Sequence, residues 1–212
     1  MIGISLGAVV APSLVGSVTT PVLVRHGLAQ LGRPDAGSGG LGLASVLGGG
    51  AAGAAATAAS HRTEIWWLAP ALLIWGCTLA AAACCDAASQ RIPTPLVRCG
   101  SVLTCVFLVI GLAVAGDWSG LVLSGIAAAA AGLTMLLCWR FAGAGFGDVR
   151  LATLGGLGLG HATHRGLVVA FAAFTLITMM QAVIVLARGG NRRTTFAYGP
   201  GLTVGFLLAA AV

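Results

Sequence analysis

Long apolar runs alternate with short polar segments along this chain. A helix needs about 20 apolar residues to cross a bilayer, and most of the runs come close to that length. The pattern predicts membrane helices at 2–24, 41–59, 65–85, 96–115, 119–139, 149–160, 166–187 and 196–212. The run at 149–160 is the shortest, which is typical of a short or re-entrant segment. We therefore expect about eight membrane helices.

Composition strengthens this interpretation. The chain is 58% hydrophobic and only 8% charged, whereas a soluble domain carries roughly a quarter charged residues. A membrane β-barrel would alternate apolar and polar residues, but these runs are continuously apolar. The sequence therefore predicts an all-α, polytopic membrane helix bundle that forms a single integral-membrane domain over 1–212 and has the lipid bilayer as its partner.

The positive charges orient the predicted helices. All eleven basic residues are arginines, and they lie mainly in the short segments between apolar runs, so we interpret them as topology signals and expect no nucleic acid partner. If the N-terminus is outside and successive loops alternate in side, nine arginines share one side, which the positive-inside rule assigns to the cytoplasm. The nine are Arg25, Arg33, Arg91, Arg98, Arg140, Arg150, Arg188, Arg192 and Arg193, and the other side holds Arg62 and Arg165.

The same topology sorts the five acids. Glu64 and Asp117 fall outside. Asp35 lies in the middle of a polar loop, where we expect it to be solvated. Asp86 ends the third predicted helix and Asp148 begins the sixth, so both lie at the cytoplasmic membrane boundary. Carboxylates near hydrocarbon are costly and are usually functional, which makes these two residues the candidate site.

Two interpretations of this pair remain open. Each carboxylate can be a simple helix-end residue, and Asp148 suits that role because a helix N-terminus favours an anion. Asp86 suits it less, since it lies at a helix C-terminus. Alternatively, two adjacent aspartates share one proton, so that one activates water and the other donates to a carbonyl oxygen, as in aspartic proteases. Gly145 and Gly147 would then leave room for a substrate backbone.

Three segments carry a resemblance to a known family. They are Asp86-Ala-Ala-Ser-Gln-Arg-Ile-Pro93, Gly145-Phe-Gly-Asp-Val-Arg-Leu151 and Phe196-Ala-Tyr-Gly-Pro200. In this order they resemble three elements of the type IV prepilin peptidases, which are polytopic aspartyl proteases with a Gly-x-Gly-Asp motif. The elements are an Asp followed by a basic residue and Ile-Pro, the Gly-x-Gly-Asp-Val/Ile-Lys-Leu signature, and the Pro-Phe-Gly-Pro that opens the last helix.

The resemblance implies a specific function. The protein would remove a short basic leader from prepilins or pilin-like proteins at the cytoplasmic face of the bacterial inner membrane. Asp86 and Asp148 would be catalytic. Gly145, Gly147, Arg150 and Pro93 would contact the substrate. Residues 65–212 would form the peptidase core, and 1–64 would be a divergent region of two helices.

We expect no metal and no cofactor, because a pair of carboxylates that activates water needs neither. Many members of the family carry two Cys-x-x-Cys pairs after the first helix, and these members also methylate the new N-terminus. The loop at 25–40 is short and lacks cysteine, and the six cysteines of the chain form no Cys-x-x-Cys pair, so neither a zinc site nor a methyltransferase activity is expected. Two other functions remain alternatives: a small ion- or proton-coupled transporter, and a non-catalytic pilus assembly factor.

Overall fold

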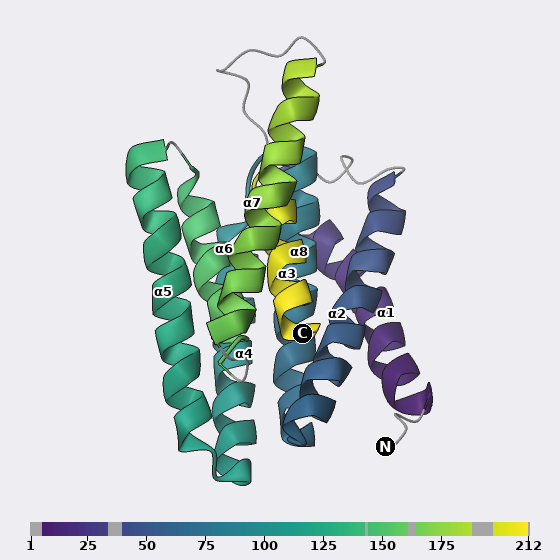
Figure 1. The fold of residues 1–212 in the computed structure, drawn as a ribbon. Coiled ribbons are helices and arrows are strands. Elements are labelled where there is room, and N and C mark those ends of the chain that lie inside the picture. Colours follow the sequence, from purple (N-terminus) through teal and green to yellow (C-terminus); the bar gives the residue numbers. More distant parts are fainter. Residues whose placement is uncertain (1–5, 34–39, 143, 161–163, 188–196, 212) are drawn as a thin grey trace.

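The structure of the protein is a computed structural model that describes all residues except 1–5, 34–39, 143, 161–163, 188–196 and 212 (Figure 1). The described part is helical and contains no strand. Its helices are α1 (Leu6–Gln30), α2 (Gly40–Thr63), α3 (Ala69–Ser89), α4 (Thr94–Ala115), α5 (Trp118–Ala142), α6 (Phe146–Leu157), α7 (His164–Ala187) and α8 (Gly199–Ala211), with a 3₁₀ turn at Trp66–Leu68 before α3.

Four of the described helical segments are long and apolar enough to cross a membrane. They are Gly40–Thr63, Trp66–Ser89, Thr94–Ala115 and Trp118–Phe141. Apolar segments at Val168–Gln181 and Gly199–Ala211 are shorter. The prediction of an all-α protein is thereby confirmed, and four of the helical segments have the length and apolar composition expected of membrane helices. Crossing by about eight helices, and an outside N-terminus, stay predictions.

Two helices continue past the charged residues at which the apolar pattern ends. α1 runs on beyond Arg25 to Gln30, and α3 runs on beyond Asp86 to Ser89. Each of these helices is followed by a residue in the left-handed conformation, Gly32 at φ 69° and Gln90 at φ 53°. Backbone geometry of this kind ends a helix by capping its last carbonyls. The charged residues themselves do not end these helices, and the exposed Arg25 can extend its side chain into water.

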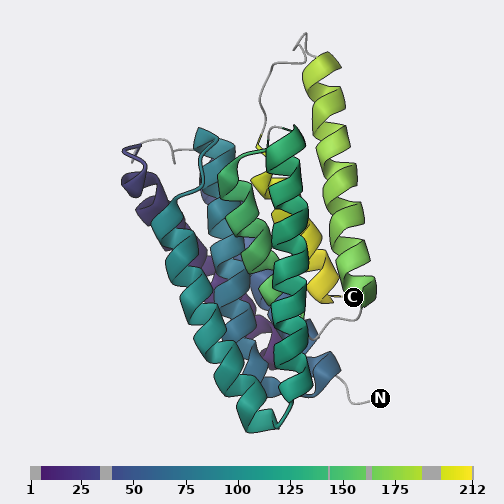
Figure 2. The ribbon, with the colours of Figure 1, turned by 90° about the vertical axis from the view of Figure 1, so that its left-hand side faces the viewer.

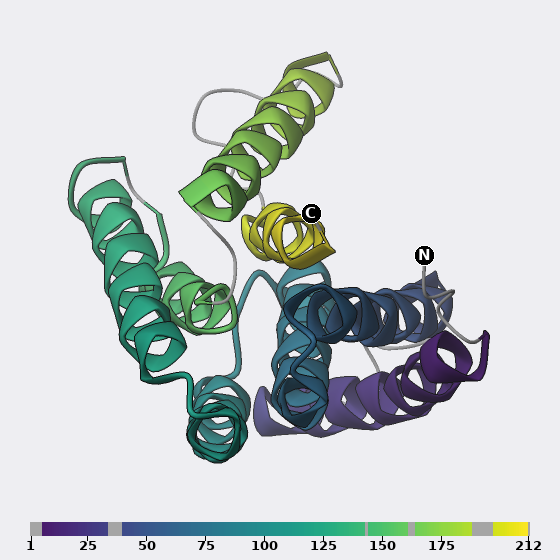
Figure 3. The same ribbon diagram turned by 60° about the horizontal axis from the view of Figure 1, so that its bottom comes forward.

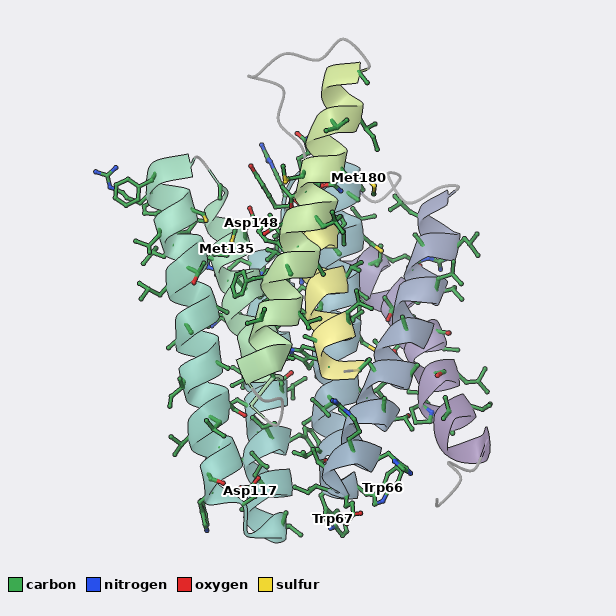
Figure 4. The ribbon with its side chains drawn as sticks, viewed as in Figure 1. Trp66, Trp67, Asp117, Met135, Asp148 and Met180 are labelled. Carbon is green, nitrogen blue, oxygen red and sulfur yellow. The ribbon has the colours of Figure 1, made fainter. Side chains whose placement is uncertain are left out.

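The helices alternate in direction, with α3 at the centre. α3 contacts α1, α2, α4, α6 and α8. Figures 1 and 2 show neighbouring helices running up and down the bundle, and Figure 3 shows α7 at its edge, beside α8. Trp66, Trp67 and Asp117 lie at one end of the bundle, and Asp148 lies towards the other (Figure 4). The ends of α3 and α5 and the starts of α4, α6 and α8 therefore share the Asp148 end.

α6 and α8 are only about half as long as their neighbours. They contain 12 and 13 residues, which reach roughly 20 Å at 1.5 Å per residue, less than the roughly 30 Å hydrocarbon layer. Both begin at the Asp148 end and stop part way along the bundle (Figures 1 and 2).

Side chains from other helices bind the carbonyls at the ends of these two short helices. The fully buried Trp75 of α3 donates its indole N–H to the carbonyl of Leu154 in α6, at 2.8 Å. Arg62 of α2 donates to the carbonyl of Ala210 in α8, at 2.7 Å. The last carbonyls of a helix lack partners within it, and unpaired carbonyls away from water are costly. These donors therefore allow α6 and α8 to end inside the bundle.

Candidate active site

Asp86 lies in the last turn of α3 and contacts the start of α8. Its side chain is buried, with 6% exposed. Its Oδ2 accepts a hydrogen bond from the backbone N–H of Gly199, at 2.8 Å. A helix N-terminus carries a partial positive charge and favours an anion. The start of α8 therefore offsets the unfavourable position of Asp86 near the C-terminus of its own helix.

Asp148 lies in the first turn of α6 and is equally buried, with 5% exposed. Its Oδ2 accepts a hydrogen bond from the N–H of Gly145 at 3.0 Å, and its own N–H donates to the carbonyl of Gly145 at 3.1 Å. This reciprocal pair closes the helix start as the simpler interpretation of Asp148 predicts. A structural bond at one oxygen leaves the other carboxylate oxygen available for chemistry.

The two carboxylates, hereafter the carboxylate pair, interact electrostatically. The pKa of Asp148 is raised to about 6, first by burial and then by the charge of Asp86, while the hydrogen bond from Gly145 opposes the shift. Two carboxylates that repel each other do not readily ionise together, so near pH 6 the pair holds one proton. The topology predicted that both lie at the same boundary, and in the structure they interact electrostatically at the same end of the bundle.

The raised pKa of Asp148 predicts how protein stability depends on pH. The ordinary pKa of 3.8 applies to the unfolded chain, so between about pH 4 and about pH 6 the folded protein binds the proton more tightly. Stability is therefore lost as pH rises through this range and is constant above it. We expect the melting temperature in detergent to rise on acidification from about pH 7 to about pH 4.5, by the equivalent of about 2 kcal/mol from this group.

The matched variant for this measurement is Asp148→Asn, which keeps the shape and the hydrogen bond to Gly145. We expect it to be more stable than the wild type at neutral pH and to lack most of the stabilisation on acidification. If the melting temperature of this variant depends on pH as steeply as that of the wild type, the titration of Asp148 is not the cause of the pH dependence.

The segment between α3 and α4 packs over the start of α6. A Cβ atom at Gly147 would lie 3.1 Å from Cβ of Ile92, so the space beside this glycine is filled by Ile92. A Cβ atom at Gly145 would lie 3.1 Å from Oδ2 of Asp148. Gly147 is thus explained by packing within the protein, and a substrate contact at either glycine stays a prediction.

The two other residues predicted to contact the substrate lie around the same end. Arg150 is exposed, donates to the hydroxyl of Thr94 at 2.6 Å and lies 5.0 Å from the ring centre of Phe146. It therefore ties the start of α6 to the start of α4. Pro93 is buried, and its ring lies close to Gly27 of α1. Their roles in substrate binding stay predictions.

The contact between the start of α8 and Asp86 is the part of the site that the sequence did not predict. Gly199 holds Asp86, and burial followed by the charge of Asp148 raises the pKa of the neighbouring Tyr198. Both residues fall in the Phe196–Pro200 segment, whose resemblance to a family element was its one sequence signal.

The arrangement suits acid–base chemistry. Two buried carboxylates that share a proton supply one general base and one general acid. Among the residues that the structure describes, no group of three or more His, Cys, Asp or Glu side chains is placed to hold a metal ion. Comparisons with the models of known protein families, with curated proteins and with solved structures found no match for this chain.

Proposed function

We propose that the protein is a membrane aspartyl endopeptidase that removes the short basic leader from type IV prepilins or pilin-like proteins. The carboxylate pair is the observation that carries this proposal. Asp86 and Asp148 come from different helices, both are buried, and each accepts a backbone N–H bond at the same end of the bundle. Acids that only cap helix ends have no need to be buried at the same end of the bundle.

The two carboxylates take different roles in the proposed reaction. Asp148, with its pKa raised to about 6, takes up the shared proton as the pH falls towards that value and donates it towards the carbonyl oxygen of the scissile peptide. Asp86, held by the N-terminus of α8, is the ionised base that removes a proton from the attacking water. The tetrahedral intermediate then collapses as the leaving amine takes the proton that Asp86 removed from water, and Asp148 recovers its proton from a hydroxyl of the intermediate.

The arginines support an orientation for this chemistry. The alternating helices bring the ends that carry Arg91, Arg98, Arg140 and Arg150 to the same end as Asp148 (Figure 1). By the positive-inside rule this end faces the cytoplasm, so the proposal places the N-terminus outside and the site at the cytoplasmic face of the bacterial inner membrane. That is also the side on which the basic leader of a prepilin lies.

The direct test is cleavage by the purified protein in liposomes. The substrate is a prepilin-like protein with a basic leader followed by a hydrophobic helix. We expect a shorter product whose new N-terminus, determined by mass spectrometry, lies at the start of that helix. If a folded preparation leaves a panel of such substrates intact, the proposal is wrong. Proton or cation flux without cleavage would instead favour the transporter alternative.

A further inference from the structure

A narrow crevice lies between the end of α5 and the middle of α7. It encloses about 170 Å³. Met135 and Cys138 of α5 line one wall, and Thr178 of α7 lines the other. Figure 4 shows Met135 and Asp148 at a similar level of the bundle. The crevice therefore lies at the level of the carboxylate pair.

Two further lining residues connect the crevice to the carboxylate pair. Ala144 directly precedes the residue whose N–H binds Asp148, and Tyr198 directly precedes the residue whose N–H binds Asp86. The charge of Asp148 also acts on Tyr198. The crevice is thus bounded on one side by the two backbone segments that hold the carboxylates.

An open apolar face of α7 continues the crevice along the bundle. Thr175 and Met179 line both the crevice and a wider hollow of about 690 Å³ on the same helix. Leu176 and Val168, which also line this hollow, are 70% and 67% exposed. Within the described part of the chain α7 packs mainly against α8, and Figure 3 shows it standing apart from α5.

We propose that this face of α7 binds the hydrophobic helix of the substrate protein, and that the crevice receives the unwound segment that carries the scissile bond. This inference rests on the proposed peptidase function and assigns the surface that the substrate uses. The occupant is a transmembrane segment of another protein, which lies along α7 and ends beside the carboxylate pair.

The chemistry of the surface changes along its length in the way this occupant requires. The hollow on α7 is lined mostly by apolar side chains, which suit a helix in lipid. The crevice adds a thiol, a phenol and the hydroxyl of Thr178, whose Oγ1 is buried without a hydrogen-bond partner among the described residues. An unwound peptide has free N–H and C=O groups to offer, whereas a helical backbone does not.

The size of the crevice also favours an unwound peptide segment as its occupant. An α-helix with its side chains is about 10 Å wide, so a space of about 170 Å³ admits extended chain and not a helix. Proteolysis also requires an extended segment, because the carbonyl of the scissile bond must be free of helical hydrogen bonds. A lipid chain would cover the apolar face but would offer no hydrogen-bonding group to the hydroxyl of Thr178.

A second groove provides an internal control. It encloses about 450 Å³ between α1, α3 and α4, and Cys99 lines it. None of its lining residues adjoins the N–H groups that hold the carboxylate pair. Cys99 is exposed, whereas Cys138 in the crevice is half-buried. Cys105 is exposed too, so a thiol probe that follows accessibility alone reacts at Cys99 and Cys105 before Cys138.

Cross-linking to the native cysteines tests the inference. The Asp148→Asn protein in liposomes receives a prepilin-like substrate with a single cysteine, scanned through the residues around the cleavage site, and a short bis-maleimide. We expect chymotryptic mass spectrometry, which separates the peptide of Cys138 from those of Cys99 and Cys105, to find cross-links to Cys138, strongest for cysteines next to the cleavage site. Cross-links to Cys99 or Cys105 without Cys138, to none of these cysteines, or between two copies of the protein through Cys138 would overturn the inference.

A second pair of variants measures binding through catalysis. Thr175→Trp places a large side chain where the crevice meets the hollow, and we expect it to raise KM for the prepilin at least about tenfold, with a smaller change in kcat. Met180→Trp adds the same bulk on α7 outside both spaces and is expected to leave KM unchanged. Equal KM values for both variants would argue against the groove. Absence of cleavage by the wild type would instead reject the peptidase itself.

Discussion

Replacing either member of the carboxylate pair, by Asp86→Ala or Asp148→Asn, is expected to abolish leader cleavage while the protein still accumulates in the membrane. Removal of the ionised base leaves water unactivated, and removal of the acid leaves the carbonyl oxygen without its proton donor. Such groups each contribute about 10²–10⁴ to rate. Because the two share one proton and act as a unit, each single variant should lose at least about 10³-fold, and the double variant little more.

The measurement is the fraction of a co-expressed prepilin that loses its leader, read on a gel beside the amount of membrane-inserted enzyme. Asp117→Asn is the control. Asp117 lies at the opposite end of the bundle (Figure 4) and accepts bonds from Ser119 and Gly120, at 2.6 and 2.9 Å. The Asp117→Asn protein should therefore cleave the prepilin at the wild-type rate. Normal cleavage by Asp86→Ala or by Asp148→Asn would reject the catalytic assignment.

Loss of the fold is not expected to explain the loss of activity. Asp148→Asn removes a buried charge that is repelled by Asp86, so this variant should unfold at a higher temperature than the wild type at neutral pH. An inactive variant that is more stable than the wild type separates chemistry from folding. Functional groups are often held at a cost in stability, so that replacing them makes a protein more stable but inactive.

Where the chain carries its own turn residues, the sequence predicts the helices closely. The predicted helix 96–115 is α4, Thr94–Ala115, and 119–139 is α5, Trp118–Ala142. Pro95 stands in the first turn of α4, and Gly116 after it adopts a left-handed φ of 70°. Proline at a helix start and glycine past its end act locally, so their effect can be read from sequence.

The interactions that end the two short helices could not be predicted in this way. Trp75 and Leu154 are 79 residues apart, and Arg62 and Ala210 are 148 apart. The sequence marks Trp75 as one more apolar residue of a membrane helix and Arg62 as a loop charge. Which carbonyl each of them binds depends on how the helices pack, and packing is not encoded in any local pattern.

For the candidate site, too, local sequence patterns predicted one part, and contacts that depend on helix packing were not predicted. The arginine pattern and the two helix-boundary positions predicted that Asp86 and Asp148 lie on one side. The role of α8 was missed, because the bond between Gly199 and Asp86 joins segments 113 residues apart. The glycine beside Asp148 has an explanation that sequence alone did not offer, since Ile92 occupies the space at Gly147.

Gly199→Ala is expected to impair both the site and the fold. A Cβ atom at Gly199 would lie 2.8 Å from Oδ2 of Asp86 and 3.0 Å from its Cβ, closer than such contacts occur. Either the carboxylate or α8 must then shift, and in both cases the hydrogen bond that holds the carboxylate is disturbed. A displacement of about 1 Å in a catalytic group lowers rates about 100-fold, and the overpacking destabilises by about 1–3 kcal/mol. Cleavage rate and melting temperature measure the two effects.

Gly201→Ala, two residues further along α8, is the matched control. A Cβ atom there would meet its nearest neighbours, on α7, at 3.4 to 3.5 Å, which is ordinary van der Waals contact. Alanine also favours the helix relative to glycine by about 1 kcal/mol, so this variant should cleave normally and be no less stable. If Gly199→Ala behaves like Gly201→Ala, the start of α8 does not position Asp86, and the carboxylate pair does not depend on this contact.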